Sequence, residues 1–350
     1  MRPIVIAAGG TGGHFAPAEA FAAELSRRGV RFALMTDTRT AARAAMNFDE
    51  RYVLAGAGIA GRGVARGAAA GLSMARGAVQ ARKILRRIGA AGVVAFGGYP
   101  AVAPVLAARS LGLRVVLHEQ NAVVGRANRS LARFADFLAL SLPDTARIPA
   151  ISHRVLGNPV IGALSDVPYR ADASLLIFGG SLGARVFSDV VPPALAALPA
   201  PLRARLRVTQ QCRAEDISRV QTVYAMAGIA AELSPFFPDV ARRMAEATLV
   251  IARAGASTVA ELAMAGRPSI LVPLPHAIDD HQSANARVLA DAGGAWVMAQ
   301  PEFDAAGLTA LLTTLLTSPD KLSEAAAAAT TVARPNAAAD LADAVEGVFA

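Results

Sequence analysis

The sequence predicts an α/β protein with two doubly wound domains facing each other across a cleft. Short apolar, β-branched runs alternate with alanine-rich helical stretches along the 350 residues, which is the pattern of parallel sheets covered by helices on both faces. Three runs end in a glycine pair, at Gly9-Gly10, Gly97-Gly98 and Gly179-Gly180. The pattern restarts near residue 174, and a chain of this length exceeds one ordinary hydrophobic core.

The strands are expected at the apolar runs, and the domains on either side of a proline-containing linker. The linker is assigned to Gly157-Asn158-Pro159-Val160, which gives a first domain over 1–157 and a second over 158–350. The last helix is a candidate to pack back on the first domain. The predicted strands are 3–8, 31–35, 92–96, 114–117, 137–140, 174–178, 205–209, 248–252 and 269–272.

The composition excludes several classes of protein. Hydrophobic residues make up 54% and charged residues 18%, which excludes a disordered chain. The single cysteine, Cys212, excludes an internal disulfide and fits a reducing compartment. The uncharged stretch 88–108 is broken by Gly97–Pro100 and Pro104, so a strand, turn and helix explain it better than a membrane span. Glycines break the N-terminal apolar run, so we expect a cytoplasmic protein without a signal peptide.

Positive charge is concentrated in the first half of the chain. Residues 1–165 contain 21 Arg or Lys against 8 Asp or Glu, whereas residues 166–350 contain 14 against 19. This asymmetry predicts an anionic partner for the first half. Nucleic acid is not expected, because the basic stretches have few aromatic residues for base stacking. The segment from Arg62 to Arg87 has the pattern of a basic amphipathic helix lying on an anionic membrane surface; the alternative is a solvated helix face.

The first glycine turn is the main candidate for chemistry. Gly9-Gly10-Thr11-Gly12-Gly13-His14 follows a strand and precedes a helical stretch from Ala16 to Ser26. Such a turn directs backbone N–H groups and the positive helix end toward an anion. His14 is a candidate general base. The alternative is a glycine turn needed only for close packing of the strand against the helix.

Polar residues follow a strand at His118-Glu119-Gln120-Asn121. At the carboxyl end of a strand they are placed for ligand binding. Asn121 can bond a sugar hydroxyl, and Glu119 can orient a neighbouring side chain. A strand-end cap and turn is the structural alternative.

The second half has two candidate phosphate sites. Ser181 lies in the turn Gly179–Arg185, whose spacing matches neither a dinucleotide fingerprint nor a Walker A loop. In Arg253–Glu261, Ser257 or Thr258 is expected to cap a helix whose N-terminus binds phosphate. Glu261 either completes a capping box or holds the two hydroxyls of a ribose.

A polar loop near residue 280 is the candidate for sugar recognition, through Gln282. Its residues His276, Asp279, Asp280 and His281 also allow a metal-site interpretation. Because these groups crowd one loop, and no Asp-x-Asp carboxylate pair exists elsewhere, we expect neither a metal nor a cofactor.

Together these motifs identify a family. Their order and spacing resemble the MurG-type UDP-N-acetylglucosamine transferases, from residue 1 nearly to the end; the motifs are Gly9–His14, Gly97–Pro100, His118–Asn121, Gly157–Val160, Gly179–Arg185, Arg253–Glu261 and Asp280–Ala286. The resemblance implies a GT-B architecture of two Rossmann-like domains. It also implies inverting transfer of N-acetylglucosamine from UDP-N-acetylglucosamine to lipid I, the undecaprenyl-diphosphate-linked acceptor. Peripheral attachment to the cytoplasmic face of the inner membrane is implied as well.

The resemblance assigns roles to particular residues. For the reaction itself we expect the 4-hydroxyl of N-acetylmuramic acid to be the nucleophile, with His14 as its base or as a positioning residue. From the resemblance, the following roles are implied. Glu261 would hold the ribose, Gln282 the sugar, Ser181 the diphosphate, and Phe237 the uracil through its backbone. The substrate-binding residues are Thr11, Gly12, Gly13, Asn121, Ser181, Phe237, Ala256, Ser257, Thr258, Val259, Ala260, Glu261 and Gln282.

The sequence departs from the family pattern at two places. Ile161 stands where the family usually has a donor-site arginine, and Thr209-Gln210-Gln211-Cys212 replaces a His-Gln-Ser/Thr-Gly turn. Both bear on donor affinity more than on the fold. Two alternatives remain, a UDP-N-acetylglucosamine 2-epimerase-like enzyme and a non-catalytic membrane scaffold.

Overall fold

The chain forms two compact units in a computed structural model. The structure describes residues 2–350 except 11, 42–47, 49, 56–63, 163, 165–166 and 181–182. The first unit comprises Met1–Ile161 together with Arg334–Ala350, and the second comprises Gly162–Ala333. The first unit is therefore discontinuous in sequence, because the C-terminal segment belongs to it.

The first unit is built on a parallel sheet of order β3-β2-β1-β4-β5-β6-β7. Its strands are β1 (Ile4–Ala7), β2 (Phe32–Thr36), β3 (Arg51–Val53), β4 (Gly92–Ala95), β5 (Arg114–Glu119), β6 (Phe137–Leu140) and β7 (His153–Val155). Its helices are α1 (Gly12–Arg27), α2 (Thr38–Ala41), α3 (Val64–Ile88), α4 (Val102–Arg109), α5 (Arg126–Leu131) and α14 (Ala337–Phe349), with short 3₁₀ turns at Tyr99–Ala101 and Ala132–Phe134.

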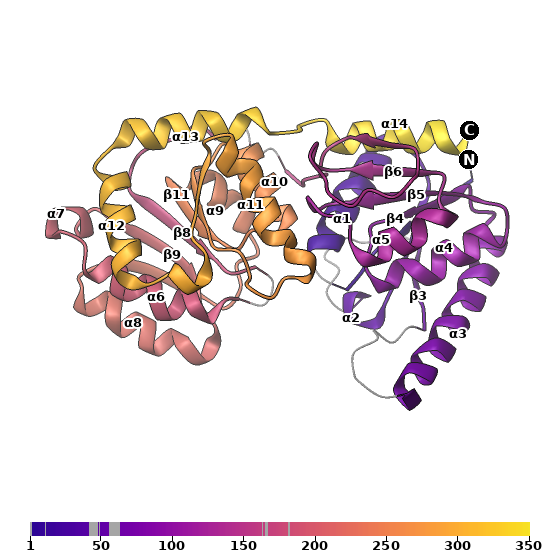
Figure 1. Ribbon diagram of the computed structural model, residues 1–350, viewed down its shortest axis with the longest axis horizontal. Helices are drawn as coiled ribbons and strands as arrows, with labels where there is room; N and C mark the ends of the chain where they lie inside the picture. Colours follow the sequence, from indigo (N-terminus) through magenta and orange to yellow (C-terminus); the bar gives the residue numbers. More distant parts are fainter. Residues whose placement is uncertain are drawn as a thin grey trace. The chain divides into compact units, whose positions relative to one another are not determined.

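Helices flank the first sheet (Figure 1). The alternating side chains of its strands build a core on each face. Ile4 and Ile6 of β1 pack with Phe21 of α1 and Leu341 of α14. Val5 and the other inward residues of the opposite face pack with α3 and α4. Because strand side chains point alternately to the two faces, an uninterrupted apolar strand is buried on both sides, as the sequence predicted for a parallel sheet.

The second unit repeats this plan with a parallel sheet of order β10-β9-β8-β11-β12-β13. Its strands are β8 (Ser174–Phe178), β9 (Arg207–Gln211), β10 (Ala230–Ser234), β11 (Leu249–Ala252), β12 (Ser269–Leu271) and β13 (Ala295–Val297). Its helices are α6 (Arg185–Ala196), α7 (Ala200–Arg203), α8 (Ile217–Met226), α9 (Val240–Glu246), α10 (Ala256–Ala265), α11 (His281–Asp291), α12 (Ala305–Leu316) and α13 (Pro319–Thr331), with 3₁₀ turns at Ala214–Asp216, Ile278–Asp280 and Gln300–Glu302.

Two cores cover the faces of the second sheet as well. One joins β8 and β9 to α6, α8 and α12, and the other joins β11 to α10 and α11. Each predicted strand run corresponds to an observed strand, so the doubly wound α/β fold is confirmed. Four observed strands, β3, β7, β10 and β13, were not predicted.

Candidate functional site

Each sheet has one point where the strand order reverses direction. In the first sheet it lies between β1 and β4, and in the second between β8 and β11. Chains leaving the two strands at such a point turn to opposite faces, which opens a crevice at their carboxyl ends. The glycine turns Gly9-Gly10 and Gly97-Gly98 follow β1 and β4, so the structure brings these two turns together.

His14 lies at the first of these crevices. Helix α1 begins at Gly12 rather than near Ala16 as expected, so His14 is the third residue of a helix and not part of the turn. Its imidazole packs on the backbone of Gly97 and Gly98: an added Cβ on either glycine would lie 3.4 Å from the ring. Both glycines have positive φ, 81° and 69°, a conformation that other residues rarely adopt.

The first turn is a smaller anion cradle than the sequence suggested. The N–H of Gly10 donates to Oγ1 of Thr40 at 2.9 Å and is therefore not available to a ligand. Gly12, Gly13 and His14 are the first residues of α1, whose N–H groups have no acceptor within the helix. Thr11 lies outside the described residues.

Strand β5 continues further than predicted and includes His118 and Glu119, which are buried. The predicted end of this strand at residue 117 is therefore two residues too early. Glu119 accepts hydrogen bonds from the side-chain amide of Asn121 at 3.1 Å and from that of Asn128 at 2.9 Å. It also accepts from the N–H of Gly125 at 2.8 Å. The carboxylate thus fixes the orientation of Asn121 at the end of β5.

The helix that follows β11 begins differently from the expectation. Gly255 is the N-cap of α10, no side chain caps the helix, and Ser257 and Thr258 lie in the first turn. The capping box proposed for Glu261 is therefore wrong. The hydroxyl of Ser257 is buried and has no hydrogen-bond partner among the described residues. The N–H of Val259 donates to Gly255 O at 2.9 Å. The N–H groups without an acceptor within the helix are therefore those of Ala256, Ser257 and Thr258.

Glu261 is a half-buried carboxyl in the second turn of α10. Burial raises the pKa of Glu261 from 4.5 to about 7, because desolvation disfavours the charged form. Ala256 and Val259 are buried and Ala260 is half-buried. Val259 contributes its side chain to the core, and Thr258 is a buried polar residue; Ser257 and Glu261 are the half-buried polar residues of this stretch.

The turn after β8 is held by a residue outside the predicted site. Gln211, the last residue of β9, accepts a hydrogen bond from Gly179 N–H at 3.0 Å and donates to Pro235 O at 3.2 Å. A Cβ on Gly179 would lie 2.3 Å from Ala184 N, so this turn requires glycine. Ser181 lies outside the described residues.

Phe237 and Gln282, two further predicted site residues, make contacts within the second unit. The ring of Phe237 is buried, and the guanidinium of Arg243 lies 4.5 Å from its centroid; only its backbone remains for a ligand. Gln282, in the first turn of α11, accepts a hydrogen bond from Leu274 N–H at 3.0 Å. Its amide nitrogen makes no hydrogen bond within the described ranges.

Arg253 is a cation at the carboxyl end of β11. Its guanidinium donates to Val272 O at 3.0 Å, Pro273 O at 3.1 Å and Oε1 of Gln300 at 2.6 Å. Burial lowers the pKa of Arg253, and no carboxylate of the described chain pairs with it. Its positive charge therefore lies uncompensated immediately before α10. By contrast Ile161, at the position of the missing family arginine, is an exposed apolar residue.

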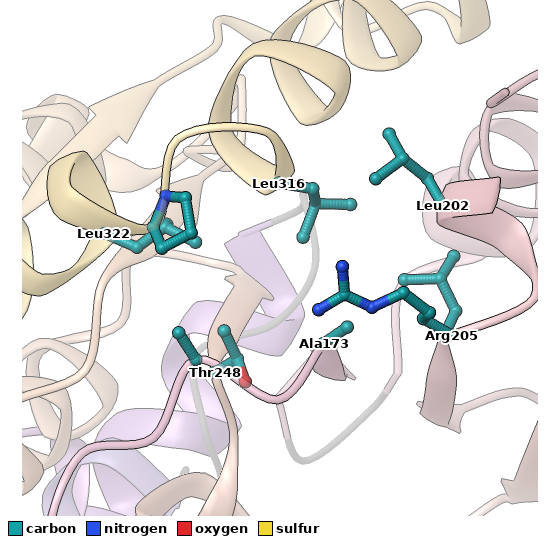
Figure 2. Close-up of a pocket in the computed structure, with 9 residues that line it drawn as sticks. Ala173, Leu202, Arg205, Thr248, Leu316 and Leu322 are labelled. Carbon is teal, nitrogen blue, oxygen red and sulfur yellow. The ribbon is translucent and has the colours of Figure 1, made fainter.

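A small cavity lies at the other end of the second sheet. It is lined by Ala173, Leu206 and Thr248, which immediately precede β8, β9 and β11; Figure 2 shows Ala173 and Thr248 beside it. Its volume of about 20 Å³ holds about one water molecule. The candidate site is therefore the strand ends with the glycine turns, and not this cavity. Among the described residues no three His, Cys, Asp or Glu side chains are grouped as metal ligands.

Helix α3 contains the basic segment predicted from Arg62 to Arg87. Arg62 lies outside the described residues, as does the side chain of Arg66. Arg82 donates to Ser110 O, and Arg87 lies over the ring of Tyr52, so these two serve the fold. An exposed face with helical spacing carries Leu72, Arg76, Val79, Lys83 and Arg86. None of the helices in the described chain is both long and apolar enough to cross a membrane.

Comparison with known proteins identifies the class. The chain belongs to glycosyltransferase family 28: the family's N-terminal domain matches residues 4–139, and its C-terminal domain matches residues 174–344. A solved structure, MurG of Acinetobacter baumannii, is 33% identical with a TM-score of 0.80, covering 99% of this chain and 100% of that one.

Curated relatives place the chain within the family. The UDP-N-acetylglucosamine--N-acetylmuramyl-(pentapeptide) pyrophosphoryl-undecaprenol N-acetylglucosamine transferase of Granulibacter bethesdensis is 56% identical, covering 99% of this chain and 94% of the relative. The protein of the same name from Gluconobacter oxydans is 51% identical and covers 99% of both. The resemblance to MurG-type transferases is thereby confirmed. A UDP-GlcNAc 2-epimerase from Neisseria meningitidis, 12% identical with a TM-score of 0.68, shares the fold alone.

Three residues that organise the site were not predicted: Thr40, Gln120 and Gln211. Gln120 stood in a recognised motif but received no role; its amide oxygen is 2.9 Å from Nδ1 of His14. Each acts through a hydrogen bond to a residue at least 30 positions away. For Gln120 and Gln211 the signal available in the sequence was their position directly after or at the end of a strand, whereas Thr40 lies within the short helix α2.

Proposed function

We propose that this protein transfers N-acetylglucosamine from UDP-N-acetylglucosamine to the 4-hydroxyl of N-acetylmuramic acid in lipid I, with inversion, and so makes lipid II for peptidoglycan synthesis. The observation that carries the proposal is the pair of switch points, each with a glycine turn and a helix N-terminus at the carboxyl ends of its strands. Near full-length similarity to the named transferases supports it.

The second unit is proposed to bind the donor. The N-terminus of α10, the unpartnered hydroxyl of Ser257 and the charge of Arg253 offer donors for the diphosphate. Glu261 accepts the ribose hydroxyls, and Gln282 binds the sugar. Arg253 supplies the positive charge that Ile161 lacks. The other proposed contacts are Ser181, Phe237 through its backbone, Ala256, Thr258, Val259 and Ala260 of this unit, and Thr11, Gly12, Gly13 and Asn121 of the first.

His14 is proposed as the general base in the first unit. The acceptor oxygen forms a bond to the anomeric carbon while the bond from that carbon to the diphosphate breaks, and the electron pair leaves with UDP. His14 takes the proton of the attacking hydroxyl. The charge that builds on the departing diphosphate is stabilised by the fixed N–H groups and by Arg253.

The first unit is further proposed to bind the acceptor at the cytoplasmic face of the inner membrane. The exposed face of α3 combines Leu72 and Val79 with three cations that form no ion pair among the described residues. Such a face attracts anionic lipid and inserts apolar side chains into the interface.

One experiment separates the proposal from its alternatives. The protein is incubated with UDP-N-acetylglucosamine with and without a water-soluble lipid I analogue, and UDP and glycolipid are quantified together. We expect UDP release only with the acceptor, and equal to product. UDP release or sugar conversion without the acceptor would instead indicate an epimerase-like enzyme, and absence of both would indicate a scaffold.

His14→Ala tests the base in the same assay. A general base contributes about 100- to 10,000-fold to turnover, so we expect kcat to fall by that range with little change in donor KM. Near-normal turnover would exclude His14 as the base.

A further inference from the structure

His14 is the first of three hydrogen-bonded side chains that lead into the core of the first unit; the other two are Gln120 and His118. Its Nδ1 is 2.9 Å from Oε1 of Gln120, and Nε2 of Gln120 is 2.9 Å from Nδ1 of His118. Nε2 of His118 is 3.2 Å from Gly157 O. Gln120 and His118 are fully buried, so both must satisfy their hydrogen bonds within this chain.

The orientation of the Gln120 amide is determined by backbone carbonyls. Its nitrogen lies 3.2 Å from Phe96 O and 3.2 Å from His118 O. A carbonyl oxygen only accepts, so the group facing the two carbonyls must be the NH₂ and the amide oxygen must face His14. A flipped amide would place one oxygen against two others.

The hydrogen bonds at the His118 end of this series run in the same direction. Because Gly157 O only accepts, the proton of neutral His118 is on Nε2, and its Nδ1 is free to accept from Gln120. Burial, together with the nearby His14, lowers the pKa of His118 to about 4. His118 therefore stays neutral near pH 7 and cannot reverse the direction of the hydrogen bonds.

We propose that Gln120 is a positioning residue that holds the neutral imidazole of His14 in the Nδ1–H tautomer. The amide oxygen of Gln120 accepts only from a protonated Nδ1, so the lone pair of His14 is on Nε2. That nitrogen makes no hydrogen bond within the described part of the chain. In a histidine, the partner of one ring nitrogen determines which nitrogen carries the proton.

The tautomer determines which atom performs the proposed chemistry. The inference rests on the proposed role of His14 as base: the acceptor hydroxyl gives its proton to Nε2, which produces an imidazolium that still donates from Nδ1 to Gln120. Packing on Gly97 and Gly98 keeps the ring from turning over. Without Gln120 the Nε2–H form is no longer excluded, and in that form Nε2 has no lone pair for the proton.

The test is a direct measurement of the tautomer in the full-length protein. Histidine-ring ¹⁵N is introduced, and long-range ¹H–¹⁵N spectra at pH 8 report which ring nitrogen of each of the five histidines carries the proton. His14→Asn and His118→Asn assign the signals. We expect Nδ1–H for His14 and Nε2–H for His118. An Nε2–H signal for His14 would overturn the proposal, whatever the activity of the His14 variant.

Gln120→Met keeps the size of the side chain and removes its hydrogen bonds to the His14 and His118 rings, together with those to the carbonyls of Phe96 and His118. We expect a His14 signal shifted toward Nε2–H and a kcat about 10- to 100-fold lower, part of the contribution of a general base, with donor KM within about twofold of wild type. Gln210→Met is the matched control, since it removes a buried glutamine that accepts from Tyr224 in the second unit. It should leave the His14 signal and its pH dependence unchanged.

The outcomes separate the two proposals. If His14→Asn turns over normally while the wild-type tautomer is Nδ1–H, the base assignment fails and the tautomer assignment stands. If Gln120→Met leaves the His14 signal unchanged, Gln120 does not set the tautomer of His14. If it shifts the signal without lowering kcat, the tautomer is set by Gln120 but the proposed consequence for catalysis fails.

Discussion

At the scale of single residues, the candidate sites of the two units contain polar groups that serve the fold and polar groups that the fold leaves unsatisfied. Glu119 and Gln120 are fully engaged, and they orient Asn121 and His14. Ser257 has no partner among the described residues, and Glu261 is desolvated without compensation. Unsatisfied buried groups cost stability and are retained where a ligand completes them.

Glu261 should make the stability of the protein depend on pH. Its pKa is about 7 in the folded protein and 4.5 as the reference value. Between pH 4.5 and pH 7 the Glu261 carboxyl is ionised in the unfolded chain and protonated in the folded protein. Its contribution to the free energy of unfolding is therefore most favourable below pH 4.5 and is lost as the pH rises through 7. Glu261→Gln removes this loss. We expect it to raise the Tm at pH 8 by more than at pH 5, as measured by calorimetry.

An equal change in Tm at both pH values would contradict the elevated pKa. Glu302→Gln is the control, because this exposed carboxyl lies in the same unit and should leave the pH dependence of the Tm unchanged.

At the scale of elements, burial decides which strands the sequence reveals. The predicted strands are central or next to central and consist of apolar runs. The missed strands β3, β7, β10 and β13 are the two edges of each sheet. An edge strand has a neighbour on one side only and tolerates polar residues, as in β7, whose sequence is His-Arg-Val. Its apolar pattern is therefore too weak to detect.

Helix α3 should bind anionic membranes through its exposed face. The triple change Arg76→Glu, Lys83→Glu and Arg86→Glu replaces three cations near the lipid, each worth about 1 kcal/mol. Removal of that attraction lowers vesicle binding by about 100-fold, and reversal lowers it further. Sedimentation with phosphatidylglycerol vesicles measures the loss, while turnover of a water-soluble acceptor stays near wild type.

The control for α3 is the same change of charge in the second unit, at the exposed residues Arg170, Arg205 and Lys321. If this variant loses vesicle binding to the same extent, net charge rather than the face of α3 is responsible. Binding of the α3 variant at the wild-type level would contradict the assignment of this face.

At the scale of the whole molecule, the C-terminal helix completes the first unit. Leu341, Ala342 and Val345 of α14 are buried with Ile4, Ile6 and Phe21. The ring of Phe349 occupies the space where a side chain on Gly92 would lie, 2.5 Å from an added Cβ. Arg28, the residue after α1, donates to Ala339 O at 3.0 Å and pairs with Asp343 at 2.6 Å. The fold of the first unit therefore depends on residues at the far end of the chain.

Shortening a buried side chain of α14 should lower the stability of the first unit and not that of the second. Leu341→Ala removes a fully buried side chain and should cost about 2–5 kcal/mol. Hydrogen exchange is expected to rise in β1 and β5, whereas Leu322→Ala in α13, buried in a core of the second unit, should raise it in β8 and β9. Increased exchange of β8 and β9 in Leu341→Ala would contradict the assignment of α14 to the first unit.

The sequence by itself determined the doubly wound fold, the central strands and the motifs at their ends, because strand burial and glycine turns leave local patterns. It also carried the family resemblance. It misplaced the start of α1, the end of β5 and the N-cap of α10, where contacts distant in the sequence decide the boundary. The sequence named the last helix only as a candidate to pack on the first domain, and the tertiary structure supplied the contacts of α14 there. Only the tertiary structure brought Gln120 to His14, 106 positions apart. Such pairings follow from packing across the sheet, which no local pattern of residues records.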